Sequence, residues 1–206
     1  MPMILAFVAA VFMYHHVAPT AQPGKYARAL TVTPEEFSAQ LDWLRARGCA
    51  IVHASTIVDD ARDGELSACE VALTFDDGYD DAAAYAAPAL THMGATGTFF
   101  IATGEIGLRG HMTVADLRML NDLGMELGAH TVHHLDLRNA STRVREFEIG
   151  SSVATLRAWT GGRVTDFAYP SGQYDPAVER IVAAAGVRHA FTTSPGAING
   201  SAIRNM

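Results

Sequence analysis

The stretch EVALTFDDG, residues 70–78, joins an apolar run to two adjacent carboxylates and a glycine. The run EVALTF predicts a buried strand, and two anions at a shielded strand end repel one another unless a cation, a proton or a hydrogen-bond donor relieves them. An isolated DDG is most often a turn in which Gly78 takes a positive φ. At the end of a buried strand, Asp76 and Asp77 instead call for a partner from elsewhere in the fold.

Short β-rich runs alternate with helical patterns on both sides of this stretch. Strands are expected over 6–14, 49–54, 70–75, 97–103, 125–130, 166–170 and 189–193, and helices over 33–48, 55–64, 80–94, 113–124, 141–160 and 175–186. Such alternation implies right-handed βαβ units and a parallel sheet. About seven parallel strands predict an α/β barrel in a single domain over residues 1–206. The alternative, an open doubly wound sheet, lacks the expected GxGxxG after its first strand.

Composition excludes several classes of protein. The net charge is -7, and no basic cluster could track a phosphate backbone, so nucleic acid is not an expected partner. No stretch reaches the ~18 apolar residues of a membrane span, so we expect a protein that is not integral to a bilayer. The apolar N-terminus has no positive charge before Lys25 and makes a poor signal peptide.

The two cysteines, Cys49 and Cys69, each begin an apolar segment and lack CxxC or CxxH spacing. We expect two buried thiols. A disulfide is the alternative if the two strands are neighbours, and cysteine usage alone does not fix the compartment.

Polar side chains follow several of the predicted strands, and parallel strands of a barrel bring such groups to one rim. His130 and His134 are four residues apart, so one turn or tight loop places both imidazoles on one side. Two histidines and a carboxylate, here Asp77, are a common set of ligands for a catalytic divalent metal. Asp76 then stays free as a base, and His133 is expected to point away into solvent.

Three further segments have a structural and a functional interpretation. Residues 170–172, Pro-Ser-Gly, form either a plain turn or a loop whose backbone N–H groups act as an oxyanion hole. His15 and His16 occupy successive positions, so at most one of them faces the pocket. His189 begins its strand and is expected to be non-catalytic.

Together TFDDG (74–78), HTVHH (130–134) and FAYPSGQY (167–174) resemble the polysaccharide deacetylase family, also called the NodB-homology domain or carbohydrate esterase family four. This resemblance implies a distorted (β/α) barrel that removes N-acetyl groups from amino sugars with one divalent metal, commonly Zn²⁺, with Co²⁺ or Ni²⁺ as alternatives. By motif, Asp76 would be the general base. The metal ligands would be Asp77, His130 and His134. The backbone amide of Ser171 would stabilise the oxyanion.

The chain departs from the common family pattern at Ala168 and Ser171, where an Arg and a Tyr often stand. No fourth motif with Asp and Trp is present, and Trp159 is expected to pack inward from a helix. The LxH that usually supplies an acid histidine is also missing. In the branch that deacetylates exopolysaccharides such as poly-N-acetylglucosamine, the first strand supplies this histidine, and His15 matches it. The chain ends at SAIRNM, 201–206, about where the family continues into another strand, so truncation is an open alternative.

The resemblance predicts metal-assisted hydrolysis of N-acetyl groups on a carbohydrate, in the cell envelope or periplasm. The alternatives are a metal-independent hydrolase of small cyclic amides, a carbohydrate-binding domain without catalysis, and a phosphoester hydrolase. The last alternative lacks a second metal shell or an arginine clamp. The polysaccharide and the oligomeric state are not specified by the sequence.

Overall fold

The computed structural model describes residues 8–21 and 26–195. The interpretation of the N-terminus as a poor signal peptide and the alternative of a truncation at 201–206 concern in part residues 1–7 and 196–206, which lie outside the described ones. Within the described ranges, none of the helices combines the length and the apolar composition needed to cross a bilayer.

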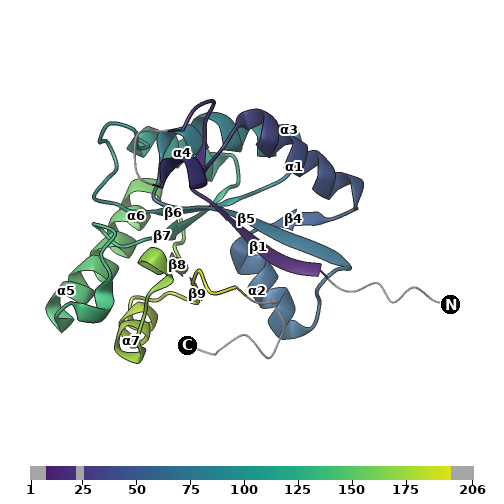
Figure 1. Cartoon of the computed structure of the whole chain (residues 1–206). Coiled ribbons are helices and arrows are strands. Elements are labelled where there is room, and N and C mark those ends of the chain that lie inside the picture. Colours follow the sequence, from purple (N-terminus) through teal and green to yellow (C-terminus); the bar gives the residue numbers. More distant parts are fainter. Residues whose placement is uncertain (1–7, 22–25, 196–206) are drawn as a thin grey trace.

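One sheet of seven parallel strands organises the molecule, in the order β1-β5-β6-β7-β8-β9 with β4 also paired to β5. Its strands are β1 (Val8–Tyr14), β4 (Ala50–Val52), β5 (Cys69–Phe75), β6 (Thr98–Ile101), β7 (Glu126–Ala129), β8 (Asp166–Ala168) and β9 (His189–Phe191). The sheet curls into a half-barrel, which confirms the predicted α/β fold and its seven parallel strands (Figure 1). A separate two-residue ladder joins β2 (His16–Val17) to β3 (Thr31–Val32).

The central strand β5 carries the DDG stretch at its carboxyl end. Strand β1 pairs with all seven residues of β5 and so occupies one whole edge. Strands β4 and β6 therefore share the other edge, β4 against residues 70–72 and β6 against residues 74–75. Because neighbours flank β5 on both edges, the strand is buried along its length, as its continuous apolar run predicts.

Helices pack on both faces of the sheet. They are α1 (Pro34–Ala46), α2 (Ala54–Asp63), α3 (Ala87–His92), α4 (Val114–Asp122), α5 (Thr142–Glu146), α6 (Ser152–Thr160) and α7 (Pro176–Ala184). Short 3-10 turns are η1 (Ala27–Ala29), η3 (Leu137–Asn139) and η5 (Pro170–Gly172), and η2 (Ala82–Ala86) and η4 (Phe147–Ser151) are π-helical. Capping boxes at Thr33 and Thr113 start α1 and α4, at the beginning of the helices expected over 33–48 and 113–124.

Two of the predicted helices are interrupted by these π-helical segments. The expected helix over 80–94 begins as η2, and Pro88 then lies in the first turn of α3, which continues directly from η2. The expected helix over 141–160 is α5, η4 and α6 in succession. Such π segments are frequent at functional sites.

Side chains of β5 point alternately to the two faces of the sheet, so they contribute to two separate hydrophobic clusters. Val71, Leu73 and Phe75 join the main cluster, which also contains buried residues of α1 and α3. Ala72 points the opposite way and packs against Ile57 of α2. Figure 1 shows α1, α3 and α4 on one side of β5 and α2 on the other. The two layers hold β5 fixed, and with it the residues at its end.

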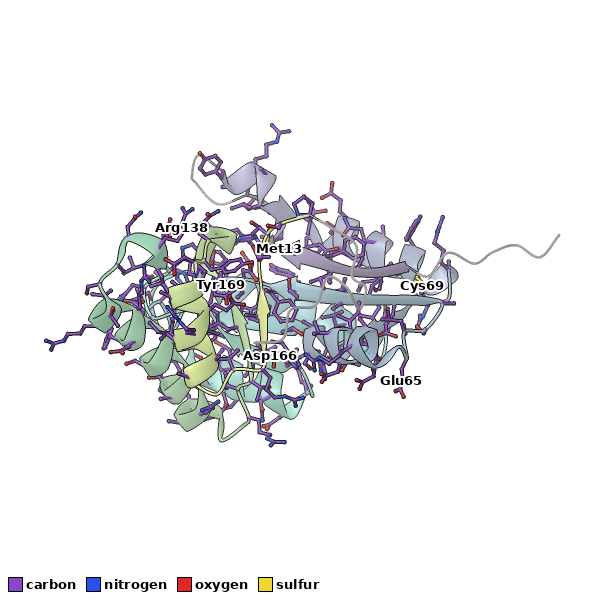
Figure 2. All side chains as sticks on the ribbon, turned by 90° about the horizontal axis from the view of Figure 1, so that it is seen from below. Met13, Glu65, Cys69, Arg138, Asp166 and Tyr169 are labelled. Atoms are coloured by element: carbon purple, nitrogen blue, oxygen red, sulfur yellow. A yellow bond between two sulfur atoms is a disulfide. The ribbon has the colours of Figure 1, made fainter. Side chains whose placement is uncertain are left out.

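Cys49 and Cys69 form a disulfide, so the expectation of two free thiols is wrong and the alternative is correct. The reason is strand register: Ala50 of β4 lies opposite Glu70 of β5, which places the two cysteines beside one another with a Cα–Cα distance of 4.5 Å. Figure 2 shows this bond at Cys69, at the start of β5. Sequence spacing alone could not reveal that β4 and β5 are neighbours.

Candidate metal and catalytic site

The carboxyl ends of β5 and β7 bring Asp77, His130 and His134 together. One ligand atom of each lies within 4.8 Å of the other two, and within the described ranges they form the one group of three or more such side chains that could hold a metal ion. Nε2 of each histidine is 3.4 Å from Asp77 Oδ1. The two imidazoles lie edge to face at a centroid distance of 4.8 Å. The geometry predicted from the spacing of HTVHH is therefore present.

The chemistry of these donors suits a divalent cation. Asp77 Oδ1 is buried and has no hydrogen-bond partner, an arrangement that costs free energy unless a ligand or ion completes it. His130 Nδ1 donates to the carbonyl oxygen of Ala168 at 2.7 Å. That bond leaves Nε2 of the neutral ring free to bind, and fixing a metal-binding histidine through its other nitrogen is the usual arrangement.

Burial and charge give the members of the group different pKa values. Burial would raise the pKa of Asp77, but the adjacent imidazole of His130 and the charge of His134 outweigh it and lower the pKa to about 2. Burial tends to lower the pKa of His130, yet Asp77 and Asp76 raise it overall. Burial and then the charge of His130 lower the pKa of His134. Asp77 is thus held as a carboxylate, the form that binds cations.

Asp76 has a contrasting environment at the end of the same strand. Its side chain is nearly buried, and its backbone N–H donates to Tyr14 of β1. Burial raises its pKa to about 6; the charge of His130 opposes this effect and the charge of Asp77 adds to it. No arginine contributes to the shift, consistent with Ala168 at the position where the family often has one. A carboxyl with this pKa suits proton transfer near neutral pH.

Of the two adjacent histidines, His15 lies close enough to this group for its charges to act on the imidazole. Burial lowers its pKa, and the charges of Asp77, His130 and His134 also act on it. His16 is buried and donates through Nδ1 to Asp81 Oδ2 at 2.7 Å, while the backbone N–H of Val17 donates to the other oxygen of Asp81. The expectation that at most one of the pair faces the pocket agrees with this arrangement.

All non-glycine residues with positive φ in the described part of the chain belong to the candidate site segments. They are Asp77 at 74°, Thr131 at 66°, His134 at 53° and Ser171 at 53°. Left-handed backbone costs of the order of 1–3 kcal/mol for such residues and tends to occur at functional sites. Thr131 is the most unusual of them, since it is β-branched. Gly78 also has a positive φ, at 83°, which is the feature of the turn interpretation of DDG.

Ser171 lies in η5, directly after β8, and its side chain is exposed. The carbonyl of Ala168, at the end of β8, is the one that accepts from His130. The Pro-Ser-Gly turn therefore begins at the same rim as the histidine pair. Gly172 is required here, since a Cβ at that position would lie 2.2 Å from Thr193 Oγ1.

Three residues that the sequence analysis expected to be non-catalytic lie outside the metal-binding group. The His133 side chain is 54% exposed and pairs with Glu148, so it points away from the cluster but is not simply solvated. His189 is buried between Asp166 and Asp59 at the start of β9. Trp159 packs, half-buried, against the main core from α6. None of the three reaches the metal-binding group.

Two residues next to the site, Tyr79 and Glu148, were not predicted from the sequence. Tyr79 stacks on His16 at a ring-centroid distance of 3.8 Å, and burial and then the charge of Asp77 raise its pKa to about 12. Glu148 holds the segment between the two site histidines. The position of Glu148 could have drawn attention to it. Residues 148, 152 and 156 lie on one buried face of the helical segment, and a charged residue is unusual on such a face.

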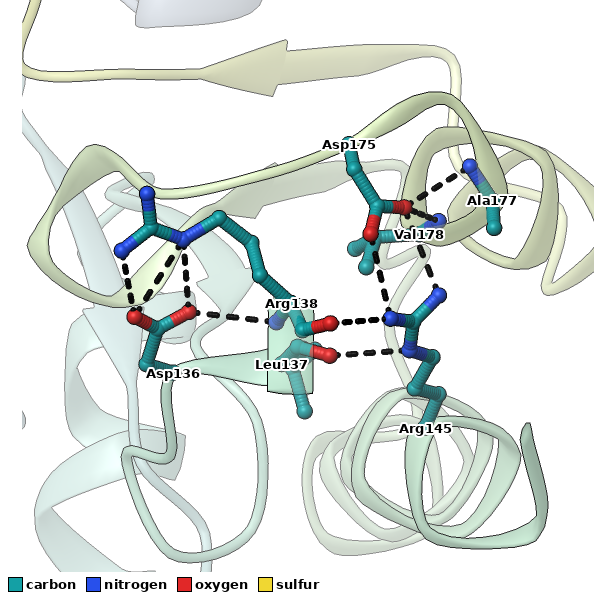
Figure 3. A network of polar contacts seen from close by, with 7 residues as sticks. All are labelled: Asp136, Leu137, Arg138, Arg145, Asp175, Ala177 and Val178. Atoms are coloured by element: carbon teal, nitrogen blue, oxygen red, sulfur yellow. Dashed lines mark hydrogen bonds and ion pairs between the residues drawn. The ribbon is translucent and has the colours of Figure 1, made fainter. Parts of the chain in front are cut away.

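Arg145 joins the two loops that border the site. It donates through Nε to the carbonyl of Leu137 at 2.8 Å and through a terminal nitrogen to that of Arg138 at 2.5 Å. The same guanidinium pairs with Asp175, which caps α7 by accepting from the backbone of Ala177 and Val178 (Figure 3). The segment that follows His134 is thereby attached to the segment that follows the Ser171 turn.

Comparison with known proteins identifies one family. The sequence profile described as "Polysaccharide deacetylase" matches residues 63–190. The curated protein "Putative polysaccharide deacetylase YxkH" of Bacillus subtilis (strain 168) is 27% identical over 190 residues, which cover 91% of this chain. The chain spans 65% of the length of that relative.

Solved structures share the fold over most of the chain. The Streptococcus pyogenes deacetylase PplD, determined in complex with acetate, is 27% identical with a TM-score of 0.76, over 87% of this chain and 80% of that one. IcaB from Ammonifex degensii is 24% identical with a TM-score of 0.82, over 96% of this chain and 89% of that one. At that identity, the second likeness concerns the fold alone.

Proposed function

The chain belongs to the polysaccharide deacetylase family, and on that premise we propose that it is a metal-dependent deacetylase that hydrolyses N-acetyl groups of an amino-sugar polysaccharide and releases acetate. The observation that carries the proposal is the cluster of Asp77, His130 and His134 with the unpartnered Oδ1 of Asp77 at its centre. The complex of the Streptococcus pyogenes deacetylase with acetate supports the same product class.

Asp77, His130 and His134 would hold one divalent ion, and this donor set suits Zn²⁺ best, with Co²⁺ or Ni²⁺ as alternatives. When bound, the ion would supply Lewis-acid polarisation of the acetyl carbonyl and activation of water. The second nitrogen of His130, bonded to the carbonyl of Ala168, orients the ring for that role.

Asp76 acts as the general base in this proposal. Its pKa of about 6, raised by burial, leaves it ionised at neutral pH and still basic enough to take a proton from the attacking water. The backbone N–H of Ser171 donates to the oxyanion that forms at the acetyl carbon, a contact worth roughly 3 kcal/mol when well placed. His15 gives a proton to the departing amine. Burial lowers the pKa of His15, which makes its imidazolium a stronger acid.

The location of His15 supports a place for this chain in the exopolysaccharide branch of the family, and therefore an exopolysaccharide as its substrate. That branch takes its acid histidine from the first strand, and here His15 lies within electrostatic reach of all three proposed ligands. The disulfide between Cys49 and Cys69 supports an oxidising compartment, such as the periplasm or cell envelope. An N-acetylated carbohydrate is therefore the proposed partner of the site.

Two substitutions separate the roles of the adjacent carboxylates. Asp76→Asn should bind metal as the parent does and release acetate from N-acetylglucosamine oligomers about 10²–10⁴-fold more slowly, because the base is lost. Asp77→Asn should lose metal as well as activity. The measurement is metal content together with acetate release for both variants. An Asp76→Asn protein with near-parental turnover would contradict the assignment of the base.

A further inference from the structure

The metal-binding group depends on a short loop that joins its two histidines. His130 follows β7 directly, and His134 lies four residues later with its backbone in the left-handed region. Between them, Thr131 is also left-handed, fully buried, and has a hydroxyl without a hydrogen-bond partner. Strained residues of this kind persist only where their surroundings hold them in place.

Glu148 supplies that restraint from a distant part of the chain. Its Oε2 accepts from the backbone N–H of Val132 at 3.0 Å and of His133 at 2.8 Å. Its Oε1 accepts from His133 Nδ1 at 2.7 Å. Glu148 is only 2% exposed, so these three bonds form in a shielded environment where they are strong. One carboxylate thus fixes both the main chain of the loop and the direction of its middle histidine.

The opposite side of the loop is held by the turn after β6. The backbone N–H groups of Thr103 and Gly104 donate to the carbonyls of Thr131 and Val132 at 3.1 and 2.8 Å. A Cβ at Gly104 would lie 2.6 Å from the Val132 oxygen, so the two segments are in close contact. The carbonyls of the loop thus face the β6 turn, while its N–H groups face Glu148.

Glu148 lies in the π-helical segment η4, between α5 and α6. The same segment buries Ile149, and the following turn buries Ser152 and Val153 in the core. The helix is therefore anchored beside the loop by apolar packing as well as by this carboxylate. Glu148 thus lies in a π-helical turn of an otherwise α-helical region, and such turns are frequent at functional sites.

We propose that Glu148 is a positioning residue: it holds residues 131–134 so that His134 meets Asp77 and His130, and it turns His133 away from the metal-binding group. The inference rests on the proposed function only in assigning a metal ion to these side chains. Glu148 would not touch the ion; it would act by accepting hydrogen bonds from the backbone of the loop that carries His134.

The test combines amide hydrogen exchange with metal affinity. Glu148→Asp keeps the charge but is one methylene shorter, so it cannot hold the two amides and His133 together, and Glu148→Ala removes all three bonds. In metal-free protein, both variants should raise exchange at the amides of residues 132 and 133 while leaving α1 unchanged. Their apparent dissociation constant for Zn²⁺ should rise about 10- to 100-fold, as for other outer-shell partners.

Two further variants serve as controls. Glu146→Ala removes an exposed carboxylate two residues away and should match the parent in both measurements. Glu148→Gln keeps the shape and an oxygen acceptor for both main-chain amides, so it should retain most of the protection.

Unchanged exchange or unchanged Zn²⁺ affinity in folded Glu148→Asp would overturn the proposal. A Glu148→Asp protein that does not fold would also overturn it, since the proposed role is local. If the parent binds no metal, the proposed function fails, while the exchange measurement still decides whether Glu148 fixes the loop.

Discussion

Asp76 and Asp77 are neighbours in the chain, yet the fold shifts the pKa values of their carboxyls in opposite directions. The side chain of Asp77 lies against two imidazoles, which outweigh burial and bring its pKa to about 2. Burial dominates at Asp76 and brings its pKa to about 6. Environments that separate the pKa values of two carboxyls are typical of sites where one residue binds and the other transfers protons.

His15 gives the first prediction at this scale. His15→Gln should lower acetate release from an N-acetyl sugar about 10²–10⁴-fold, because the amine cannot leave without a proton. Hydrolysis of an aryl acetate should change little, since a phenolate departs unprotonated. Steady-state rates with both substrates test this, and Asp76→Asn, which should lose both activities, is the matched comparison. An equal loss on amide and ester in His15→Gln would contradict an acid role.

The side chains of the central site could be predicted from the sequence, whereas their supports could not. Asp77, His130 and His134 lie in two short motifs at strand ends, and strand topology alone brings such ends to one rim. Tyr79 and Glu148 act through contacts that depend on ring stacking and on helix phase. Neither contact corresponds to a fixed spacing of residues in the sequence. The charged residue at 148, on the buried face of a helix, is the one feature that could have indicated it.

At the scale of elements, the helices were predictable where capping chemistry marks their ends. Thr33, Pro34 and Glu36 define the start of α1, where the helix over 33–48 was expected to begin. The π segments η2 and η4 were not predicted, because a single wider turn inside a helix has no capping or breaking residue of its own to mark it. The disulfide could be given only as an alternative, because it depends on the pairing of β4 with β5, which the sequence does not show.

The junction made by Arg145 yields a prediction about two elements at once. Arg145→Lys should lower the free energy of unfolding by about 1–3 kcal/mol, because a lysine cannot make the forked contacts to Leu137, Arg138 and Asp175. Hydrogen exchange should rise both in residues 135–140 and in residues 170–176. Urea denaturation and exchange measure the two effects.

Arg143 provides the control for this junction, since it is exposed on the same helix α5. Arg143→Lys should leave stability and exchange unchanged. If Arg145→Lys loosened only one of the two loops, the guanidinium would not be the connection between them.

At the scale of the whole molecule, a polar network joins β8, β9 and α2. His189 of β9 contacts Asp166 of β8 at 2.9 Å and Asp59 of α2 at 3.2 Å, and Asp59 also pairs with Arg62 and Arg188. Burial tends to lower the pKa of His189, but the two carboxylates raise it overall. The network connects the last strand of the sheet to the helix packed beneath β5.

This raised pKa sets the sign of a pH dependence. A histidine whose pKa is higher in the folded state contributes stability that is fully present below its unfolded pKa and is lost as the pH rises through the folded value. His189→Asn should therefore cost more at about pH 5.5 than at about pH 8.5. Urea denaturation at the two pH values measures the difference, with the exposed His92→Asn as control. A cost that grew with pH would contradict the assignment.

The proposed deacetylation requires a metal ion at Asp77, His130 and His134. The most direct test is acetate release from N-acetylglucosamine oligomers by the purified protein, measured against its metal content before chelation, after chelation and after return of Zn²⁺. We expect one divalent ion per chain, loss of acetate release on chelation and recovery on return of the metal. A folded protein that binds no metal, or that releases acetate equally well without it, would contradict the proposed function.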